Sequence, residues 1–289
     1  MSRASILLII MCTSLLAAGD GDYGVDTSAC RNPQVGTDIT FTETNTWEIT
    51  TGGNVLGLDF KNSGTPLILY GSNVNSHIES IYPSSGAPGP SVPLSSGNIG
   101  AFGVSWSNDT AVEFYFANDY IYADIFITGD SGSSWNSIGN PAGSDGRGID
   151  ASDGILWQAS SNISSATYIN RLELESSQNT VYQITEPQAQ LSGLTLCEYS
   201  GNPSIAVTTY SDGNIYIYEL TGRGINYSGS GSIPITFVSC YGLTYDPLDD
   251  LFYISYIDDE DRYYITELEY TTVSLQRNTF GGIKALLGS

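Results

Sequence analysis

The apolar positions of this chain recur in a pattern that begins at a glycine. Five times along the sequence, a glycine is followed by an apolar residue, a small or polar residue, and another apolar residue. The five copies begin at Gly57, Gly103, Gly148, Gly193 and Gly242, at intervals of 45 to 49 residues. A four-residue pattern alone would be a weak signal, but five copies at nearly constant spacing indicate internal repeats.

Each glycine motif is followed by short runs of aromatic and β-branched residues, which favour strands. The second run of each repeat lies at 67–70, 112–116, 155–157, 205–210 and 251–256. A third run alternates between apolar and polar residues most clearly at 120–126, 214–220 and 263–268. Weaker fourth runs lie at 91–94, 135–138, 181–185 and 233–238. No segment has a sustained apolar period of 3.6, which argues against repeated helices.

Four short strands in about 45 residues match one blade of a β-propeller. A single four-stranded sheet has two apolar faces that it cannot bury alone, so neighbouring sheets must stack and the ring must close. We therefore predict an all-β fold with one β-propeller domain over residues 39–289. Five four-stranded blades are expected, and an irregular sixth blade is the alternative.

Strands from both ends of the chain are predicted to close the ring. The segment 39–50 precedes the first glycine motif and has the character of an outer strand without a blade of its own. The segment 283–287 lies beyond the last repeat and is the second candidate. If both join the fifth blade, no free sheet edge remains to pair with another chain.

The first strand of each repeat is predicted to line the centre of the ring. The apolar residues after the glycines should be core residues: Leu58, Val104, Ile149, Leu194 and Leu243. The next residue along each strand points the opposite way, and these residues are Asp59, Ser105, Asp150, Thr195 and Thr244. They either pack tightly and bind water, or form a channel that binds an ion or ligand.

The N-terminus has the order of a secretory signal peptide. Arg3 precedes an apolar run at 6–11, and small residues follow at 17–19. We predict a signal peptide at 1–19, a flexible segment at 20–38, and a secreted or extracellular protein, with the periplasm or the cell surface as alternatives. The apolar run is shorter than the roughly 20 residues that span a bilayer, so we expect no membrane insertion.

Composition adds a strong negative charge to this picture. The chain has 31 acidic residues against 9 basic ones, a net charge of −22. Such a surface repels phosphate backbones, which excludes nucleic acid as a partner. The charge either serves solubility alone or attracts a cationic partner. We expect an extracellular glycan or protein as the ligand, and a monomer.

Metal and disulfide chemistry have few candidates. The only histidine is His77, and no two cysteines have the short spacing of a zinc or haem site. At most one disulfide can form among the three cysteines of the exported chain, Cys30, Cys197 and Cys240, and whether Cys30 pairs with Cys197 or Cys240 is left open. No cofactor is expected. Calcium is the alternative, at the acidic clusters 246–250 and 258–261, although neither has the spacing of an EF-hand loop.

Two resemblances follow from local motifs. The segment 128–135 reads Thr-Gly-Asp-Ser-Gly-Ser-Ser-Trp and resembles the Asp-box of sialidases and other propellers, which is a hairpin turn on the outer rim. This resemblance implies a fold and no chemistry, because the arginine cluster and tyrosine nucleophile of a sialidase cannot be assigned. Segments such as 242–247 followed by 251–254 look like the NHL and YWTD repeats of secreted bacterial propellers. WD40 and kelch signatures are missing.

Two functions of different classes fit the sequence. The first is a non-catalytic binding or scaffold protein outside the cell, which follows from the export signal, the repeats and the missing catalytic set. The alternative is a propeller-fold hydrolase or lyase, calcium-assisted if the acidic clusters bind that ion. Its candidate residues are Asp59, Asp150 and Arg147, which would have to converge on one pocket near the channel mouth.

Overall fold

The fold is built almost entirely from β-strands. A computed structural model describes residues 25–26, 37–50, 53–95, 100–107, 114–119, 124–162, 166–222 and 224–273. Within these ranges the one helical element is a short 3-10 turn, Gly143–Asp145. No helix of the described residues has the length and apolar character needed to cross a membrane.

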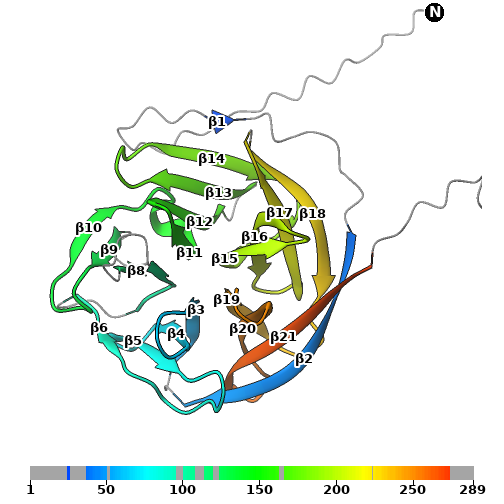
Figure 1. Cartoon of the computed structure of the whole chain (residues 1–289), viewed down its shortest axis with the longest axis horizontal. Coiled ribbons are helices and arrows are strands. Elements are labelled where there is room, and N and C mark those ends of the chain that lie inside the picture. The colour runs from blue at the N-terminus through cyan, green and yellow to red at the C-terminus, as the bar shows by residue number, and fades with distance from the viewer. Residues whose placement is uncertain are drawn as a thin grey trace, which may run out of the picture.

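Successive strands form antiparallel sheets that follow the sequence repeats (Figure 1). Repeat 1 contains β3 (Val55–Lys61), β4 (Leu67–Ser72), β5 (His77–Ile81) and β6 (Val92–Pro93). Repeat 2 contains β7 (Gly103–Ser107), β8 (Phe114–Asp119), β9 (Asp124–Thr128) and β10 (Asn136–Gly139). Repeat 3 contains β11 (Gly146–Ser152), β12 (Ile155–Asn162), β13 (Ala166–Glu173) and β14 (Asn179–Ile184).

The last two repeats are joined by a strand from the N-terminal part of the chain. Repeat 4 contains β15 (Leu191–Tyr199), β16 (Asn202–Thr209), β17 (Asn214–Thr221) and β18 (Gly224–Ser232). Repeat 5 contains β19 (Ser239–Asp246), β20 (Leu251–Ile257), β21 (Tyr263–Val273) and the N-terminal β2 (Thr37–Ile49). A two-residue parallel pairing of β2 with β18 links the two repeats into one eight-stranded sheet.

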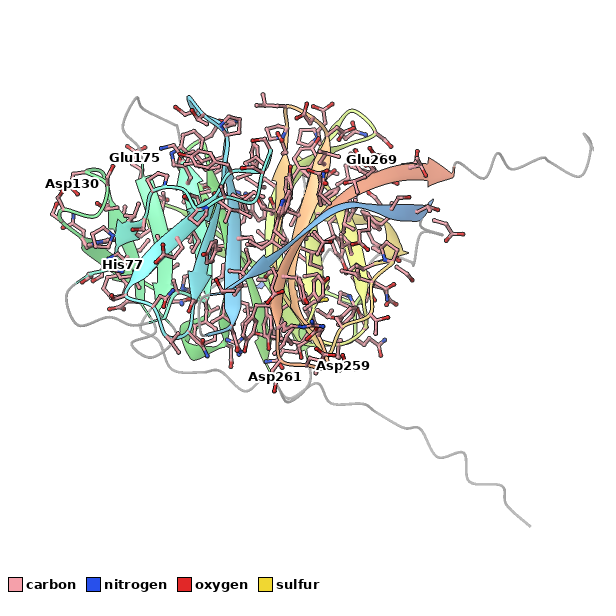
Figure 2. All side chains as sticks on the ribbon, turned by 90° about the horizontal axis from the view of Figure 1, so that it is seen from below. His77, Asp130, Glu175, Asp259, Asp261 and Glu269 are labelled. Carbon is pink, nitrogen blue, oxygen red and sulfur yellow. The ribbon has the colours of Figure 1, made fainter. Side chains whose placement is uncertain are left out.

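The first strands of the five repeats form a closed cycle at the centre. Strand β3 contacts β7, β7 contacts β11, β11 contacts β15, β15 contacts β19, and β19 returns to β3. In Figure 1 these strands surround the centre and the later strands of each repeat lie outside them. Figure 2 shows the ring from the side, with Asp259 and Asp261 at one end of the strands and Glu175 towards the other. The chain is therefore a β-propeller.

Apolar clusters fill the contacts between neighbouring repeats. One buried cluster combines side chains from repeats 1 and 2, and others combine repeats 2 and 3, 3 and 4, 4 and 5, and 5 and 1. In the last of these, the rings of Phe60 and Tyr253 stack with their centroids 5.9 Å apart. The five predicted core residues that follow the repeat glycines are all buried, as expected. Each sheet is thus stabilised by its neighbours.

The repeat glycines allow adjacent inner strands to approach each other closely. A Cβ atom on Gly57 would lie 2.7 Å from the backbone nitrogen of Val104 in the next repeat. A Cβ atom on Gly242 would lie 2.8 Å from the backbone nitrogen of Leu58, across the junction of the last repeat with the first. Real Cβ atoms do not come so close to backbone, so only glycine fits. The strand register also shifts at Gly57, between Val55 and Leu58.

The predicted closure by the N-terminal strand is confirmed for the described residues. Strand β2 pairs antiparallel with β21 from Asp38↔Val273 to Ile49↔Tyr263. Its buried residues reach two different clusters, since Ile39 and Phe41 pack between repeats 4 and 5 and Ile49 packs between repeats 5 and 1. The C-terminal candidate at 283–287 lies outside the described residues.

One predicted strand was wrong. The fourth strand of repeat 4 was expected at 233–238, but it is β18, Gly224–Ser232, and 233–238 is a connection. The sequence of β18 is rich in glycine and serine and therefore resembles a loop. The small residues are needed because β2 passes close by: a Cβ atom on Gly231 would overlap the carbonyl of Ile39. The predicted starts of the second and third runs of repeat 2, at 112–113 and 120–123, lie outside the described residues.

The N-terminal predictions are mostly outside the described residues. The signal peptide at 1–19 lies there entirely. Within the segment predicted as flexible, 20–38, the structure has Val25–Asp26 paired in parallel with β14 and starts β2 at Thr37. These two short stretches therefore take part in sheets, because β14 and β21 otherwise present unpaired backbone groups along their outer edges.

We predict that removing β2 opens the ring. A chain of residues 51–289 should aggregate or melt far below one of residues 37–289. It would lose the whole β2–β21 ladder and the burial of Ile39, Phe41 and Ile49. Each such side chain contributes about 1.5–3 kcal/mol, so the loss approaches the total stability of about 5–15 kcal/mol that is typical of a domain. Thermal melts followed by circular dichroism would test this, and equal melting temperatures would contradict it.

We also predict that Gly57→Ala destabilises the ring by about 1–3 kcal/mol through overpacking between β3 and β7. Gly139→Ala is the matched control, because Gly139 is also in a strand and nothing lies within 4 Å of its added Cβ. The control should change stability by no more than about 1 kcal/mol. The stability of both variants can be compared by urea denaturation. Equal unfolding midpoints would show that the inner strands can move apart to accept the added methyl group.

Candidate functional site

The predicted channel residues form a buried polar belt on the inner strands. Asp59, Ser105, Asp150, Thr195 and Thr244 are all buried. They hydrogen-bond to one another and to backbone groups of neighbouring inner strands, so they connect repeats 5, 1, 2, 3 and 4 in sequence around the centre. The belt therefore joins five separate parts of the chain.

Asp59 bridges the inner strands on both sides of it. Its Oδ1 accepts hydrogen bonds from the Phe60 backbone N–H at 2.8 Å and from the Thr244 hydroxyl at 3.3 Å. Its Oδ2 accepts a hydrogen bond from the backbone N–H of Trp106 in β7. Burial and the nearby negative charge of Asp150 raise the pKa of Asp59 well above its usual value. The hydrogen bonds from Trp106, Phe60 and Thr244 lower this pKa, so they offset part of the cost of burying the charge.

Asp150 makes the corresponding bridge between repeats 2 and 4. Its Oδ2 accepts hydrogen bonds from the Leu196 backbone N–H at 2.6 Å and the Thr195 hydroxyl at 3.1 Å. Its Oδ1 accepts a hydrogen bond from the Ser105 hydroxyl at 3.3 Å. Burial raises the pKa of Asp150 to about 6, although these hydrogen bonds act in the opposite direction. Asp59 and Asp150 also interact electrostatically, since the charge of Asp150 raises the pKa of Asp59.

Arg147, the third channel candidate, makes a different contact from the two aspartates. Arg147 is buried near the start of β11 and its Nη1 donates a hydrogen bond to the Gly146 carbonyl at 2.7 Å. The hydrogen bonds that Asp59 and Asp150 accept come from other residues. The structure therefore brings the two aspartates together with serine and threonine hydroxyls. Their oxygens hold strands together, which is the tight-packing interpretation of this row.

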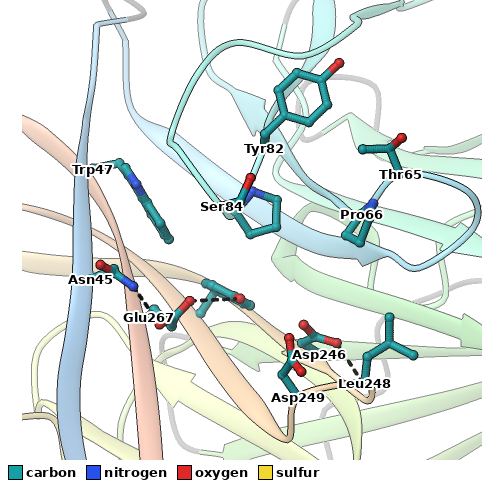
Figure 3. A pocket seen from close by; sticks show the side chains of 12 residues that line it. Asn45, Trp47, Thr65, Pro66, Tyr82, Ser84, Asp246, Leu248, Asp249 and Glu267 are labelled. Carbon is teal, nitrogen blue, oxygen red and sulfur yellow. Dashed lines mark hydrogen bonds between the residues drawn. The ribbon is translucent and has the colours of Figure 1, made fainter.

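A surface pocket lies where repeat 5 and β2 meet repeat 1 (Figure 3). Its volume is about 330 Å³. Twelve residues line it: Asn45, Trp47, Thr65, Pro66, Tyr82, Pro83, Ser84, Asp246, Leu248, Asp249, Tyr253 and Glu267. They come from β2, from the end of β19, from β20 and β21, and from loops of repeats 1 and 5. We call this the rim pocket.

The rim pocket has an aromatic wall that is held in place. The rings of Trp47 and Tyr253 lie with centroids 6.3 Å apart. The Trp47 ring packs directly on Gly86, where a Cβ atom would overlap it, and Gly86 also has a positive φ of 66° that suits glycine. The Tyr253 hydroxyl donates a hydrogen bond to Glu267 Oε2 at 3.2 Å. The wall is therefore preorganised.

The rim pocket also has three acidic residues, Asp246, Asp249 and Glu267. Asp246 accepts a hydrogen bond from the Leu248 backbone N–H at 2.7 Å, and Glu267 accepts one from the Asn45 side-chain amide at 2.9 Å. Burial raises the pKa of Asp246, and the charges of Asp249 and Glu267 raise it further. Burial and the charge of Glu267 raise the pKa of Tyr253 in the same way. None of the twelve lining residues is basic.

Sequence analysis singled out only some of the residues that line the rim pocket. Asp246 and Asp249 belong to an acidic cluster that was considered for calcium, and Trp47 belongs to the predicted closing strand. Nothing local indicated that these residues meet Glu267 and Tyr82. Their meeting depends on the register of β2 against β21, which places Asn45 opposite Glu267.

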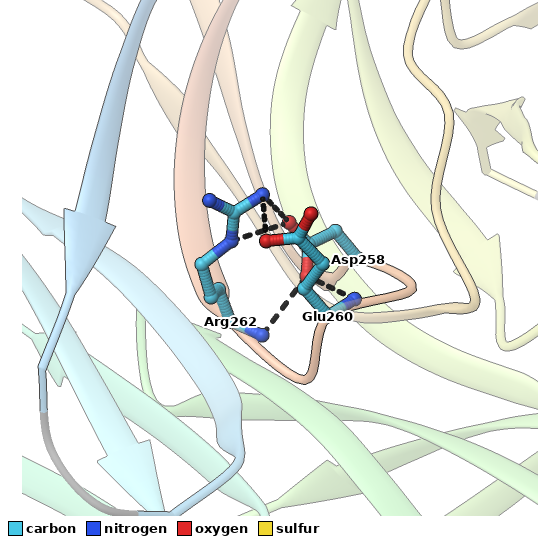
Figure 4. Close-up of polar contacts among 3 residues, drawn as sticks. All are labelled: Asp258, Glu260 and Arg262. Carbon is cyan, nitrogen blue, oxygen red and sulfur yellow. Dashed lines mark hydrogen bonds and ion pairs between the residues drawn. The ribbon is translucent and has the colours of Figure 1, made fainter.

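The acidic clusters have other partners in the structure. Asp250 Oδ1 accepts hydrogen bonds from the hydroxyls of Tyr245 at 2.7 Å and Tyr270 at 2.9 Å. In the second cluster, Arg262 forms ion pairs with Asp258 at 2.7 Å and with Glu260 at 3.1 Å (Figure 4). Across the described residues, no group of three or more histidine, cysteine, aspartate or glutamate side chains is arranged to hold a metal ion. The described residues therefore give no support to a calcium site at the acidic clusters.

The turn that resembles an Asp-box lies between β9 and β10. Asp130 Oδ1 accepts hydrogen bonds from the Ser134 backbone N–H at 2.8 Å and the Thr128 hydroxyl at 2.7 Å. These bonds and one from the Ser134 hydroxyl lower the pKa of Asp130 to about 2. The Trp135 ring nitrogen donates a hydrogen bond to the Pro93 carbonyl at 3.0 Å. Asp130 thus stabilises the turn.

The cysteines in the described residues are free. Cys197 and Cys240 are buried and form no disulfide, and burial raises the pKa of both thiols. Cys30 lies outside the described residues, and with both of these thiols free the disulfide that the sequence allowed is not formed.

Comparison with known proteins identifies the fold. No family model and no curated protein matches the sequence. Among solved structures, the chain is similar to the glutaminyl cyclase of Myxococcus xanthus, with a TM-score of 0.61 and 12% identity over 83% of this chain and 100% of that one. It also matches virginiamycin B lyase from Staphylococcus aureus, with a TM-score of 0.46 and 16% identity over 83% of this chain and 75% of that one.

An auxiliary nutrient binding protein from Bacteroides thetaiotaomicron matches with a TM-score of 0.47 and 12% identity, over 75% of this chain and 69% of that one. At these identities the similarity concerns the fold alone. The first match supports a β-propeller. Function must therefore be argued from the sites of this chain.

The buried aspartates predict a specific pH dependence. The folded pKa of Asp150, about 6, lies above the unfolded value of about 3.9, so the folded state binds the proton more tightly. The stability from this proton is fully present below about pH 4 and is lost as the pH rises to about 6. The loss is about 2–3 kcal/mol for a shift of this size.

We therefore expect Asp150→Asn to reduce the loss of unfolding free energy between pH 4.5 and pH 7.5. The asparagine oxygen can still accept the Leu196 N–H, and its amide can donate to the Ser105 hydroxyl. Denaturant titrations at the two pH values measure the effect. Glu175→Gln removes one exposed charge and should leave the pH dependence as in the wild type. An unchanged slope in Asp150→Asn would show that Asp150 does not titrate in this range.

Proposed function

We propose that this chain is a secreted, non-catalytic β-propeller of five four-stranded blades that binds an extracellular protein or glycan at the rim pocket. Support for five blades comes from the five sequence repeats, the cycle of five inner strands and one apolar cluster at each contact between repeats. Support for export comes from the N-terminal charge and apolar pattern.

The rim pocket is the observation that carries the binding function. It is concave, with a volume of about 330 Å³, and it combines fixed aromatic rings with a few polar groups. This composition is typical of ligand sites, in which apolar surfaces supply affinity and polar groups supply orientation. The side chain of Leu248, which lines the rim pocket, is 62% exposed and can therefore contact a ligand.

Binding is favoured over catalysis by the state of the carboxylates. A hydrolase needs an acid or base that can reach a substrate atom. Asp59 and Asp150 are buried and their oxygens accept hydrogen bonds from neighbouring inner strands. In the rim pocket, the oxygens of Glu267 accept hydrogen bonds from Thr44, Asn45 and Tyr253. These contacts fix the carboxylates in place and suit recognition.

A pair of surface variants tests the proposal. Leu248→Ser should lower capture of the ligand about fivefold or more, because an apolar contact of this size is worth about 1–3 kcal/mol. Val74→Ser is the matched control, since Val74 is also an exposed apolar residue, 50% exposed, on the loop between β4 and β5. Neither change should affect stability.

The measurement is a glycan array combined with a pull-down from surface extract, using the full exported chain. Binding that is weakened by Leu248→Ser and kept in Val74→Ser supports the rim pocket. No binding in either assay, or binding that both variants retain in full, would reject the proposed function.

A further inference from the structure

We infer that the rim pocket accepts a positively charged side chain, lysine or arginine, of a partner protein. This inference rests on the proposed function and specifies its ligand. Three features of the rim pocket support it: uncompensated negative charge, an aromatic wall, and a size suited to one side chain.

The negative charge of the rim pocket has no internal counter-charge among its lining residues. Asp246, Asp249 and Glu267 contribute three carboxylates, and the lining contains no lysine, arginine or histidine. The hydrogen bonds that Glu267 accepts come from the neutral groups of Thr44, Asn45 and Tyr253. The carboxylates also repel one another, which contributes to the raised pKa of Asp246. A cation placed among them would relieve this repulsion.

The acidic turn at the other end of the strands provides a contrast. There, Arg262 of the same chain forms ion pairs with Asp258 and Glu260, and its guanidinium lies 5.8 Å from the centroid of the Tyr264 ring (Figure 4). That turn therefore combines carboxylates, an aromatic ring and a cation within one chain. The rim pocket has the carboxylates and the rings, and a partner would supply the cation.

The aromatic wall favours an organic cation. Trp47 and Tyr253 present rings beside the carboxylates, and a cation within about 6 Å of such a ring is attracted by its π electrons. The exposed Leu248 can contact the aliphatic stem of a lysine or arginine side chain. Carboxylates, rings and an apolar contact together match the three parts of these side chains.

The dimensions of the rim pocket favour a single cationic side chain over a long polycation or a bare metal ion. A cavity of about 330 Å³ is at the lower limit of the roughly 300–1,000 Å³ typical of ligand sites, so it suits one side chain better than a long polycation. A bare metal ion needs three or more oxygen ligands drawn together around it, and no such cluster of acidic side chains occurs in the described residues. The carboxylates of Asp246, Asp249 and Glu267 instead line the wider rim pocket.

The test uses two short capped peptides with the full exported chain. One contains a single lysine between glycines, and the other has norleucine in its place, which keeps the aliphatic stem and removes the charge. Calorimetric titration at 20 mM and 150 mM NaCl should show that the lysine peptide binds about fivefold more tightly than the norleucine peptide at low salt. The difference should shrink at the higher salt concentration, because exposed charges are screened there.

Two charge variants locate the effect. Asp249→Asn should weaken lysine-peptide binding about threefold or more, which is the range of a partly exposed ion pair. Asp259→Asn is the matched control, because it removes the same charge from another exposed turn at the opposite end of the strands and should change nothing. Both variants should keep the wild-type melting temperature.

The outcomes separate this inference from the proposed function. Equal affinity for the two peptides, no binding of either, or full binding by Asp249→Asn would overturn the cation site. If Leu248→Ser still weakens capture of a glycan or a neutral protein, the rim pocket binds a ligand but not a cation. If Leu248→Ser has no effect on any ligand, the proposed function fails as well.

Discussion

The antiparallel pairing of β2 with β21 is the interaction on which both the ring and the rim pocket depend. This pairing joins residues 37–49 to residues 263–273, which lie near the two ends of the described part of the chain. It covers the outer edge of repeat 5 and adds buried side chains to two of the clusters between repeats. It also places Trp47 and Asn45 beside Glu267 and Tyr253. The same strand pairing therefore closes the ring and forms one side of the rim pocket.

The centre of the ring combines close approach with buried charge. The repeat glycines let inner strands meet backbone to backbone, and the next polar residues then hydrogen-bond across the contacts. Two of these residues are aspartates, and burial raises the pKa of each. A carboxylate accepts several hydrogen bonds at once, which suits a position where backbone N–H groups from a neighbouring strand converge. The cost of desolvation is offset by satisfying those donors.

Charge has different roles in different parts of the molecule. At the centre, Asp59 and Asp150 hold strands together, and at Asp258 an arginine of the same chain neutralises the turn. At Asp130 the carboxylate stabilises a tight turn. In the rim pocket, three carboxylates remain beside aromatic rings with only neutral donors. The strongly acidic composition therefore does not describe one uniform surface, and the rim pocket differs because no basic residue lines it.

The sequence by itself determined the repeats, the strand character, the inner strands and the closing role of residues 39–50. These are local or periodic properties, because strand propensity and alternation act over a few residues, and a glycine that recurs at each close approach leaves a visible period. It did not reveal β18, whose glycines and serines resemble a loop until β2 is seen to pass over them.

Only the tertiary structure decided which polar residues act together. Asp59 and Asp150 lie in different repeats, and their hydrogen bonds with Trp106, Thr244 and Leu196 cross from one repeat to the next. Asp246 and Trp47 are about 200 residues apart in the chain and share the rim pocket through the register of β2 on β21. Such contacts depend on how sheets stack and pair around the ring. No local pattern of residues encodes that arrangement.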